Sequence, residues 1–472
     1  MMNRLLLLCM ATAASVASAV EPRIASTSFA LNADNRLVTI KYVLADAPGI
    51  VTLDVQTNRT GIATADGPDW VSIGGEHLRE VVGDVNRYVE DLGEHILLWQ
   101  PDKSWPDREI PARPRGWPGP IRAVVTAWSL QTPPDYLVVD LVNSSNRWFY
   151  TGEDFLPRGG ITNDYYRQNA IVMRRIPAAG VKWTMGMNST DFAASGYSTH
   201  NMQQHYVMLT NDYYIGVFEL TMGQVRKFSS IEWVKGYINK FSNTDGTGTA
   251  NAYQYGLRFD NGDTNNCPAT EMSPSFLRTT STAAAYNWPS GRHWVDPLSW
   301  LGKVRAKTGV DFDQPTEAQW EFACRAGTGT MTYLGNFSKN DGPSRTAYLK
   351  PIAWYDETVG GASVGKLHRV GTKQANSFGL YDMIGNIDEC CLDWYASDYG
   401  IGGADVETTV FTEPDGPATG STRSFRGGYC LFSYTSMFSA ARHEHQQWFG
   451  ARLMCPVGLV FPDGEKATPV AE

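Results

Sequence analysis

The sequence lacks a cluster of basic residues, and its charge balance is mildly acidic, with a formal net charge of −9. This balance does not favour nucleic acid or an anionic membrane surface as a partner. Beyond its first twenty residues, the chain also lacks an apolar run long enough to cross a bilayer. It has no internal repeat and no low-complexity tract, so its 472 residues are expected to form about two to four globular domains.

Cysteine is absent from residues 22–142. Short segments in this part alternate between apolar and polar residues and are separated by turn-forming residues, a pattern typical of an all-β sandwich of immunoglobulin or fibronectin type. Without cysteine, such a sandwich has no inter-sheet disulfide. Residues 143–169 are polar and are expected to connect it to a second domain. The expected strands are Val38–Leu44, Val51–Gln56, His95–Trp99, Ile121–Trp128 and Tyr136–Leu141.

Residues 1–19 have the features of a signal peptide. Arg4 precedes the apolar stretch Leu5–Ala14, and Ala17-Ser18-Ala19 fits the small-x-small pattern of a cleavage site. We therefore expect export to the bacterial periplasm or the extracellular space, with Cys9 removed. The six remaining cysteines form an even number, which favours disulfides in an oxidising compartment.

From about residue 170 the pattern becomes mixed, and three helices have clear start signals. Thr221 opens a capping box before Val225–Ile238, and Thr316 opens another before a helix that extends to about Arg325. Asp296 is expected to cap a third helix that ends at Gly309. These helices separate long segments without helical periodicity, which indicates an α+β domain.

Six motifs follow one another between about residues 176 and 460. Taken in this order, they resemble the formylglycine-generating-enzyme, or sulfatase-modifying factor, family. The resemblance implies an irregular α+β fold, distantly like a C-type lectin domain, over residues 170–462, followed by a tail at 463–472. The motifs are Thr184-Met185-Gly186-Met187, Tyr213–Thr221, Gln314–Ala323, Asn376–Asn386, Phe425-Arg426-Gly427-Gly428 and Gly450-Ala451-Arg452.

The resemblance also implies a copper(I) ion held between two cysteine thiolates, which are the ligands that this soft ion prefers. In the family these cysteines follow the Gly-Gly pair and precede an Ala-Ala-Arg. Counting forward from Gly428 puts Phe432 and Met437 at the two positions, and counting back from Arg442 puts Tyr434 at the second. Neither count finds a cysteine pair, so copper is not expected here.

Other positions of the expected cleft differ as well. Tyr429 replaces the serine after Gly-Gly, while Asp388 and Cys390 replace the two tryptophans of the family's G-N-x-W-E-W motif. The candidate cleft residues are therefore Cys430, Tyr429, Arg442 and Asp388. His443 and His445 flank Glu444, but without a third ligand they are read as surface histidines.

A structural calcium ion is a further implication of the resemblance. Its ligands would be the side chains of Asp382 and Glu389 and the carbonyl oxygens of Gly385 and Ile387, a set that suits a hard cation.

The resemblance also makes Cys324–Cys455 and Cys391–Cys430 plausible disulfides, leaving Cys267 and Cys390 over. The connectivity stays open, because six cysteines allow about fifteen pairings.

Three functions are compatible with this pattern. The leading hypothesis is a divergent or non-catalytic family member that binds a peptide, a glycan or a small molecule. The alternative is an active formylglycine-generating oxidase, or another oxidoreductase with a non-standard site such as Cys430 with Cys391. A purely structural component of the cell envelope is the third. The oligomeric state is left open.

Overall fold

The computed structural model describes 13 segments of the chain. The signal-peptide candidate, the C-terminal tail, most of the helix expected to reach Ile238 and His445 lie outside them. The segments are residues 20–32, 34–58, 70–78, 81–104, 121–143, 147–197, 202–229, 258–259, 263–279, 294–356, 366–402, 405–444 and 449–458.

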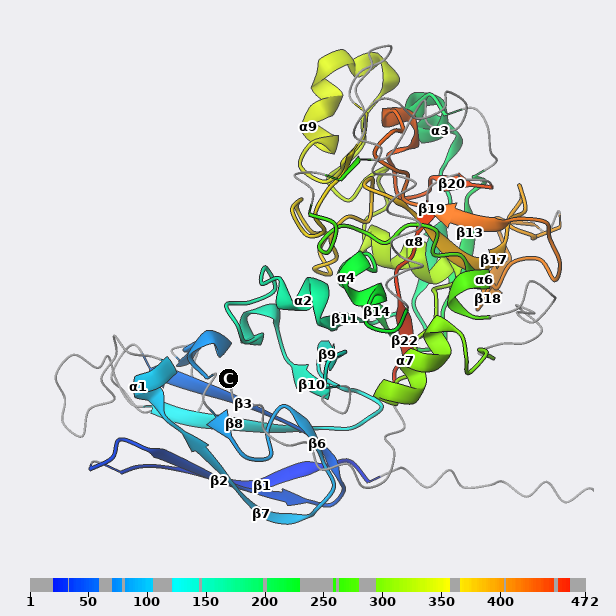
Figure 1. The fold of residues 1–472 in the computed structure, drawn as a ribbon. Helices are drawn as coiled ribbons and strands as arrows, with labels where there is room; N and C mark the ends of the chain where they lie inside the picture. Colours follow the sequence, from blue (N-terminus) through cyan, green and yellow to red (C-terminus); the bar gives the residue numbers. More distant parts are fainter. Residues whose placement is uncertain are drawn as a thin grey trace, which may run out of the picture.

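The first of two regions contains most of the N-terminal strands, drawn in blue to cyan in Figure 1. One sheet has the order β1-β2-β7-β5, and in the other β3 pairs with β4, β6 and β8. Both sheets contribute to one hydrophobic cluster. The elements are β1 (Arg23–Leu31), β2 (Val38–Ala45), β3 (Gly49–Asn58), β4 (Trp70–Ser72), η1 (Gly75–His77), β5 (Val81–Val82), β6 (Arg87–Val89), β7 (Gly93–Trp99), α1 (Pro101–Ser104) and β8 (Ile121–Trp128).

The predicted strands here are confirmed as β2, β3, β7 and β8. Tyr42 lies within β2, where residues facing the shared cluster alternate with more exposed ones. This period of two is the reason that the strand could be predicted from sequence. The immunoglobulin or fibronectin type of this region stays a prediction.

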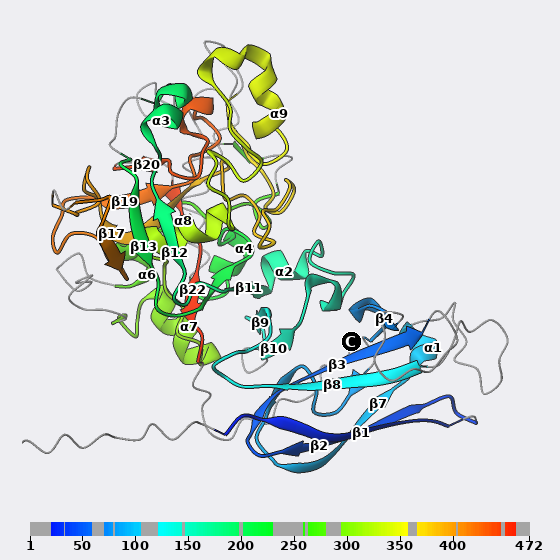
Figure 2. The ribbon, with the colours of Figure 1, turned by 180° about the vertical axis from the view of Figure 1, so that it is seen from behind.

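The last strand expected in the sandwich, Tyr136–Leu141, lies in a different sheet. It forms β9 (Tyr136–Asp140) in the sheet β10-β9-β11-β14-β22, antiparallel to β11 (Ala170–Ile176). Its assignment to the sandwich was wrong. All five residues of β9 are buried, so this strand is covered on both faces and lacks the alternation of a sandwich strand with one exposed face. In Figures 1 and 2, β9 and β10 lie between the two regions.

Residues 143–169 were expected to be a plain connector. They contain β10 (Arg147–Tyr150), η2 (Glu153–Phe155) and α2 (Tyr165–Gln168) instead. Ile50 of β3 packs in the same hydrophobic cluster as Phe149 of β10. The two regions therefore share apolar contacts as well as a covalent connection.

The second region combines short sheets with short helices, which makes the described structure mixed α/β and rich in sheet. One four-stranded sheet has the order β20-β19-β17-β21, and a three-stranded sheet has the order β12-β13-β18. Its other elements are β12 (Lys182–Met185), α3 (Ser189–Ser195), β13 (His205–Met208), β14 (Tyr213–Gly216), α4 (Met222–Val225), β15 (Arg258–Phe259), α6 (Pro274–Leu277), α7 (Trp300–Thr308), α8 (Glu317–Arg325), η4 (Lys339–Arg345), α9 (Thr346–Leu349), β16 (Lys366–Leu367), β17 (Asp388–Trp394), β18 (Val410–Thr412), β19 (Arg423–Arg426), η5 (Tyr434–Ser436), β20 (Arg442–His443), β21 (Phe449–Gly450) and β22 (Met454–Pro456).

Two of the three predicted helix starts are confirmed. Thr221 and Thr316 both form complete capping boxes, at α4 and α8. The start predicted at Asp296 is wrong: Ser299 caps α7 by accepting a hydrogen bond from the amide of Gly302, while Gly309 ends the helix in the left-handed conformation as predicted. No helix in the described segments is long and apolar enough to span a membrane.

Candidate functional site

The Gly427-Gly428 pair ends β19 and directs the chain into the expected cleft. Both glycines have positive φ, +97° and +78°. A Cβ atom on Gly428 would lie 2.6 Å from the terminal methyl of Met437. Glycine is therefore required here by backbone conformation and by the close packing of Met437.

The residues at the expected copper positions supply no thiolate. Met437 is fully buried in the core, Phe432 is half-buried, and the Tyr434 ring packs against Phe337. A thioether and aromatic rings do not replace the two anionic sulfur ligands that copper(I) prefers. The residues present therefore do not fit the family's copper ion.

Cys430, the thiol that lies in the same stretch of sequence, packs in a small apolar cluster with Cys267, Leu367 and Ile387. Burial raises the pKa of its thiol far above the usual range. Because the thiolate is the reactive form, this environment makes Cys430 inert.

The expected disulfides are absent from the described residues, in which the six cysteines from Cys267 to Cys455 are buried and form no disulfide. Cys324 and Cys391 lie in the core cluster around α8, whereas Cys455 lies in a second cluster and Cys430 in a third. Both expected pairings fail for this reason, because each would join cysteines from different clusters. The resemblance aligned them along the sequence but gave no information about where their side chains point.

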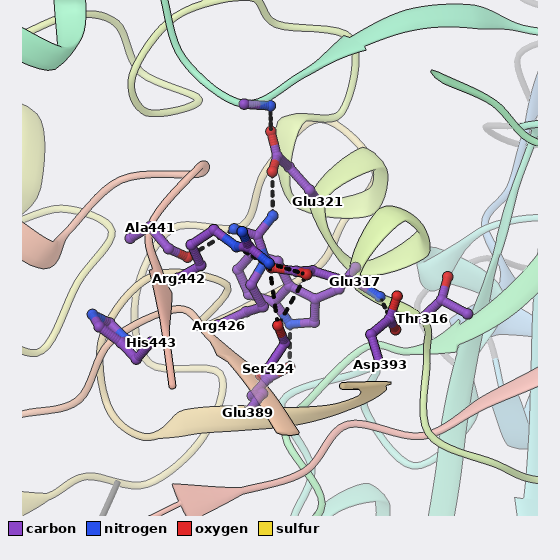
Figure 3. A network of polar contacts seen from close by, with 12 residues as sticks. Thr316, Glu317, Glu321, Glu389, Asp393, Ser424, Arg426, Ala441, Arg442 and His443 are labelled. Atoms are coloured by element: carbon purple, nitrogen blue, oxygen red, sulfur yellow. Dashed lines mark hydrogen bonds and ion pairs between the residues drawn. The ribbon is translucent and has the colours of Figure 1, made fainter. Parts of the chain in front are cut away.

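Arg442, a candidate cleft residue, is fully buried and packs toward α8 (Figure 3). Its Nε and Nη2 atoms donate to the two carboxylate oxygens of Glu317, each at 2.7 Å. Arg426 forms a parallel ion pair with Glu321, one turn further along the helix. This arrangement makes Arg442 part of the connection between α8 and the sheet, not a residue that faces a ligand.

A third buried pair completes this side of the sheet. Glu389 accepts hydrogen bonds from Arg452, the shortest at 2.7 Å, and from the indole nitrogen of Trp320 at 2.6 Å. Asp393 lies four residues after Glu389 in β17. Its side chain accepts a hydrogen bond from the backbone amide of Glu317 at 2.7 Å. Burial, with a contribution from the Glu317 charge, raises the pKa of Asp393 to about 7.

Two of the side chains expected to bind calcium, Asp382 and Glu389, have different surroundings in the structure. Asp382 accepts from the amide of Gly371 through one oxygen, and its other oxygen is buried with no hydrogen-bond partner among the described residues. Burial raises the pKa of Asp382 to about 6. Glu389, however, does not fit as a ligand, because Arg452 and Trp320 already use both of its oxygens. Calcium binding through the set of four ligands was a prediction from the resemblance, and the pairing of Glu389 with Arg452 and Trp320 makes that carboxylate unavailable for it.

The opposite side of the same strands carries Asp388 and His443. His443 Nδ1 lies 3.0 Å from Asp388 Oδ1, and the amide of Gly428 donates to the same oxygen at 2.8 Å. In Figure 3 the side chain of His443 points away from Glu317, whereas that of its neighbour Arg442 points toward it. Successive side chains on a strand alternate in direction, which explains this separation.

Aromatic side chains cover the imidazole. The ring centroids of Phe432 and His443 are 4.9 Å apart, and those of Tyr429 and Phe432 are 4.2 Å apart. Tyr197, just after α3, has its ring centroid 6.2 Å from that of His443. Burial, followed by the charge of Asp388, raises the pKa of Tyr429 to about 12, so its hydroxyl stays protonated.

The structure thus brings Asp388 and Tyr429 together near His443, and separates Cys430 and Arg442 from them. The pairing of Asp388 with His443 was missed in the sequence. A signal was present: Asp388 departs from the family motif, and His443 directly follows the Ala440-Ala441-Arg442 segment that resembles the family's Ala-Ala-Arg.

Curated relatives match about a third of this chain. A formylglycine-generating enzyme of Thermomonospora curvata is 31% identical over 152 residues, which cover 32% of this chain and 49% of the relative. The serine/threonine-protein kinase pkn1 of Chlamydia caviae is 28% identical over 156 residues, covering 33% of this chain and 22% of the kinase. The matches therefore span about half or less of these relatives.

Two solved structures are similar over 61% of the chain. Treponema denticola variable protein 1 has 22% identity and a TM-score of 0.39, with 95% of that protein covered. PvdO from Pseudomonas aeruginosa has 18% identity and a TM-score of 0.36, with 94% covered. Residues 175–454, more than half of the chain, match the sulfatase-modifying factor enzyme 1-like domain. The chain therefore belongs to the sulfatase-modifying factor, or formylglycine-generating-enzyme-like, family.

Proposed function

We propose that this chain is an exported, divergent member of its family that binds a ligand in the cleft and does not carry out copper-dependent oxidation. The observation that carries the proposal is the occupancy of the two thiolate positions by Phe432 and Met437. The first is an aromatic side chain and the second is a buried thioether. Without two thiolates, the oxygen-activating metal has no suitable ligands.

The scaffold around the cleft supports binding over catalysis. Two buried Glu–Arg pairs, Glu317–Arg442 and Glu321–Arg426, hold α8 against the sheet, so the fold motifs keep their structural role. The differences from the family lie in the cleft, at Asp388, Tyr429 and Phe432. The rings of Tyr429 and Phe432 lie beside the buried pair of Asp388 and His443, and aromatic walls with few polar groups are the usual composition of a small-ligand site.

The oxidoreductase alternative needs a redox pair such as Cys430 with Cys391. Their side chains lie in different hydrophobic clusters. Burial also raises the pKa of both thiols far above the usual range. Such a pair has neither the contact for a disulfide nor the thiolate for exchange.

Activity is tested with the purified chain, copper(I), oxygen and a peptide containing Cys-x-Pro-x-Arg, using the enzyme of Thermomonospora curvata as a positive control. We expect no formylglycine peptide by mass spectrometry. Conversion above the level of copper alone would overturn the proposal. Counting free thiols in the same sample is expected to give six for the chain from residue 20.

Export is tested separately, because it rests on residues 1–19 alone. Expressed in a Gram-negative host, the chain is expected in the periplasm, with Val20 as its first residue after cleavage behind Ala19. A cytoplasmic protein that retains residues 1–19 would contradict this part of the proposal. It would leave the argument about the cleft intact.

A further inference from the structure

The two sheets of the N-terminal region differ in how their outward faces are covered. Successive residues of a strand point to opposite faces, so Val51 of β3 lies in the core of the sandwich while Ile50 points outward. Ile50 is nevertheless fully buried, because it packs in one hydrophobic cluster with Phe149 of β10. An apolar residue on the outward face of this sheet thus has a packing partner within the chain.

The outward face of the other sheet, β1-β2-β7-β5, is exposed. In Figures 1 and 2, β1 and β2 lie on the side of the sandwich away from β9 and β10. Three branched apolar residues on this face are in contact with solvent, with exposed fractions of 52% for Val82, 47% for Ile96 and 37% for Leu98. Solvent-facing positions of a half-buried sheet are normally polar. Strand β7 therefore departs from the usual pattern at two successive outward positions.

These three residues are neighbours and form what we call the outward patch. Val82 of β5 is paired with Leu98 of β7, and Ile96 lies two residues before Leu98 on the same face. The row of Leu98 continues through Thr39 of β2 to Ala30 of β1. Single exposed apolar residues are normal on a protein surface, whereas a contiguous group marks an interaction site.

A pair of opposite charges lies beside the outward patch. Lys41 of β2 is opposite Ile96 in the pairing of β2 with β7, and its Nζ atom lies 3.0 Å from Glu94 Oε1. Glu94 lies two residues before Ile96 and on the same face. The side chains of both charged residues are about half exposed, at 46% and 55%. The patch together with this pair has no net charge, which favours neither an acidic nor a basic partner.

A second copy of the chain fits this pattern. Two copies that meet face to face through the same surface are related by a two-fold axis that lies in the interface. An axis that crosses the outward patch and runs between Lys41 and Glu94 brings the two patches into contact. It also places Lys41 of one copy opposite Glu94 of the other, and the reverse. The charges beside the patch are therefore self-complementary.

We propose that the outward face of β1-β2-β7-β5 is the interface of a homodimer, in which the outward patches of two copies pack together and Lys41 of each copy pairs with Glu94 of the other. The patch is smaller than the interface of a standard stable complex, so the dimer forms and separates reversibly. The dimer carries two copies of the cleft, one in each second region. This inference goes beyond the proposed function and does not depend on what the cleft binds.

Sedimentation equilibrium of the whole chain from residue 20, at about 1 to about 200 µM, measures the dimer directly. We expect the mean mass to rise with concentration from that of one chain towards that of two. Val82→Lys puts a charge into the patch of each copy and should weaken the dimer at least about tenfold, since a buried charge without a partner is costly. Val181→Lys is the matched control, because Val181 is 40% exposed and lies in the second region, and it should leave the equilibrium unchanged.

An exchange of the two charges tests whether the partner is a second copy. Lys41→Glu alone places like charges opposite each other in the two-fold dimer and should weaken it, as should Glu94→Lys alone. The double variant with both substitutions restores opposite charges across the axis and should recover dimerisation. Because both side chains are about half exposed, each single variant is expected to keep its fold, which the melting temperature checks.

Three results would overturn the proposal. The first is a chain that stays monomeric at the highest concentration. The second is a dimer that Val82→Lys and the single charge variants leave unchanged, because such a dimer uses another surface. The third is a monomeric chain that binds phosphatidylcholine vesicles and loses this binding in Val82→Lys, which would assign the face to a lipid surface. None of these results concerns formylglycine formation, so the proposed function is tested separately.

Discussion

The two sides of the strands β17, β19 and β20 differ sharply in what their polar side chains do. The side that faces α8 has three buried Glu–Arg pairs with both charges matched, Glu317–Arg442, Glu321–Arg426 and Glu389–Arg452. The other side has one Asp–His pair, in which one carboxylate oxygen has no hydrogen-bond partner within the described segments. The period of two along a strand places both sets within the same few residues.

The comparison separates residues that hold the fold from residues that are available for function. Charges buried in water-free surroundings are tolerated only when they are paired and hydrogen-bonded. On the α8 side Glu317, Glu321 and Glu389 are each paired with an arginine, and Glu317, Glu321, Arg426 and Arg452 lie in the motifs that identify the family. The other side meets it in part, and its carboxylate, Asp388, is a residue that departs from the motifs.

The largest predicted effect is on the α8 side. Arg442→Met keeps the volume of the side chain but leaves Glu317 buried with an uncompensated charge. We expect a loss of about 3–5 kcal/mol in the free energy of unfolding, measured by urea denaturation.

The control for this variant is Lys41→Met. Lys41 pairs with Glu94 at 3.0 Å, and their side chains are 46% and 55% exposed. Such a pair contributes at most about 1 kcal/mol. Equal losses for the two variants would contradict the structural role given to Arg442.

The Gly-Gly turn should show a smaller effect. Gly428→Ala adds a methyl group 2.6 Å from the end of Met437 at a φ of +78°. Backbone strain and overpacking together are expected to cost about 1–3 kcal/mol. Gly180→Ala is the matched control, because Gly180 has a φ of +72° and no atom within 4 Å of the added carbon. If both variants lose the same stability in urea denaturation, packing against Met437 has no role.

The sequence predicted the α8 side much better than the cleft. The capping box at Thr316 and the order of the motifs depend on local patterns, which are visible along the chain. The pairing of Asp388 with His443 depends on three strands meeting in a sheet, and no local pattern encodes it. The disulfides failed for the same reason, since burial of each cysteine in its own cluster is a property of the three-dimensional packing.

The strand Tyr136–Leu141 illustrates another limit. It was predicted as a strand correctly and assigned to the wrong sheet. Its pairing with Ala170–Ile176 crosses about thirty residues that contain their own helix and strand. Strand existence is a local property, whereas the choice of a partner strand is not.

The pH dependence of stability tests Asp393, which also faces α8. Because its pKa is raised from 3.8 to about 7, the folded chain binds a proton more tightly than the unfolded chain between these values. Stability should therefore fall as pH rises from 4 to 7, with a slope of at most about 1.4 kcal/mol per pH unit from this group. Asp393→Asn keeps an acceptor for the Glu317 amide and should flatten that slope in urea denaturation. An unchanged slope would show that Asp393 is ionised throughout.

The smallest predicted effect concerns calcium. Its measurement shows whether the buried carboxylates on the α8 side are neutralised by arginine alone. If calcium bound at a hundredfold excess over its dissociation constant, it would add about 2.7 kcal/mol and raise the melting temperature by several degrees. Because Arg452 occupies Glu389, we expect no rise between chelator and 1 mM calcium. Glu389→Gln, which weakens the pair with Arg452, should lower the melting temperature equally in both conditions. A rise for the unmodified chain, lost in Asp382→Asn, would instead mean that a cation and an arginine share the carboxylates of this side.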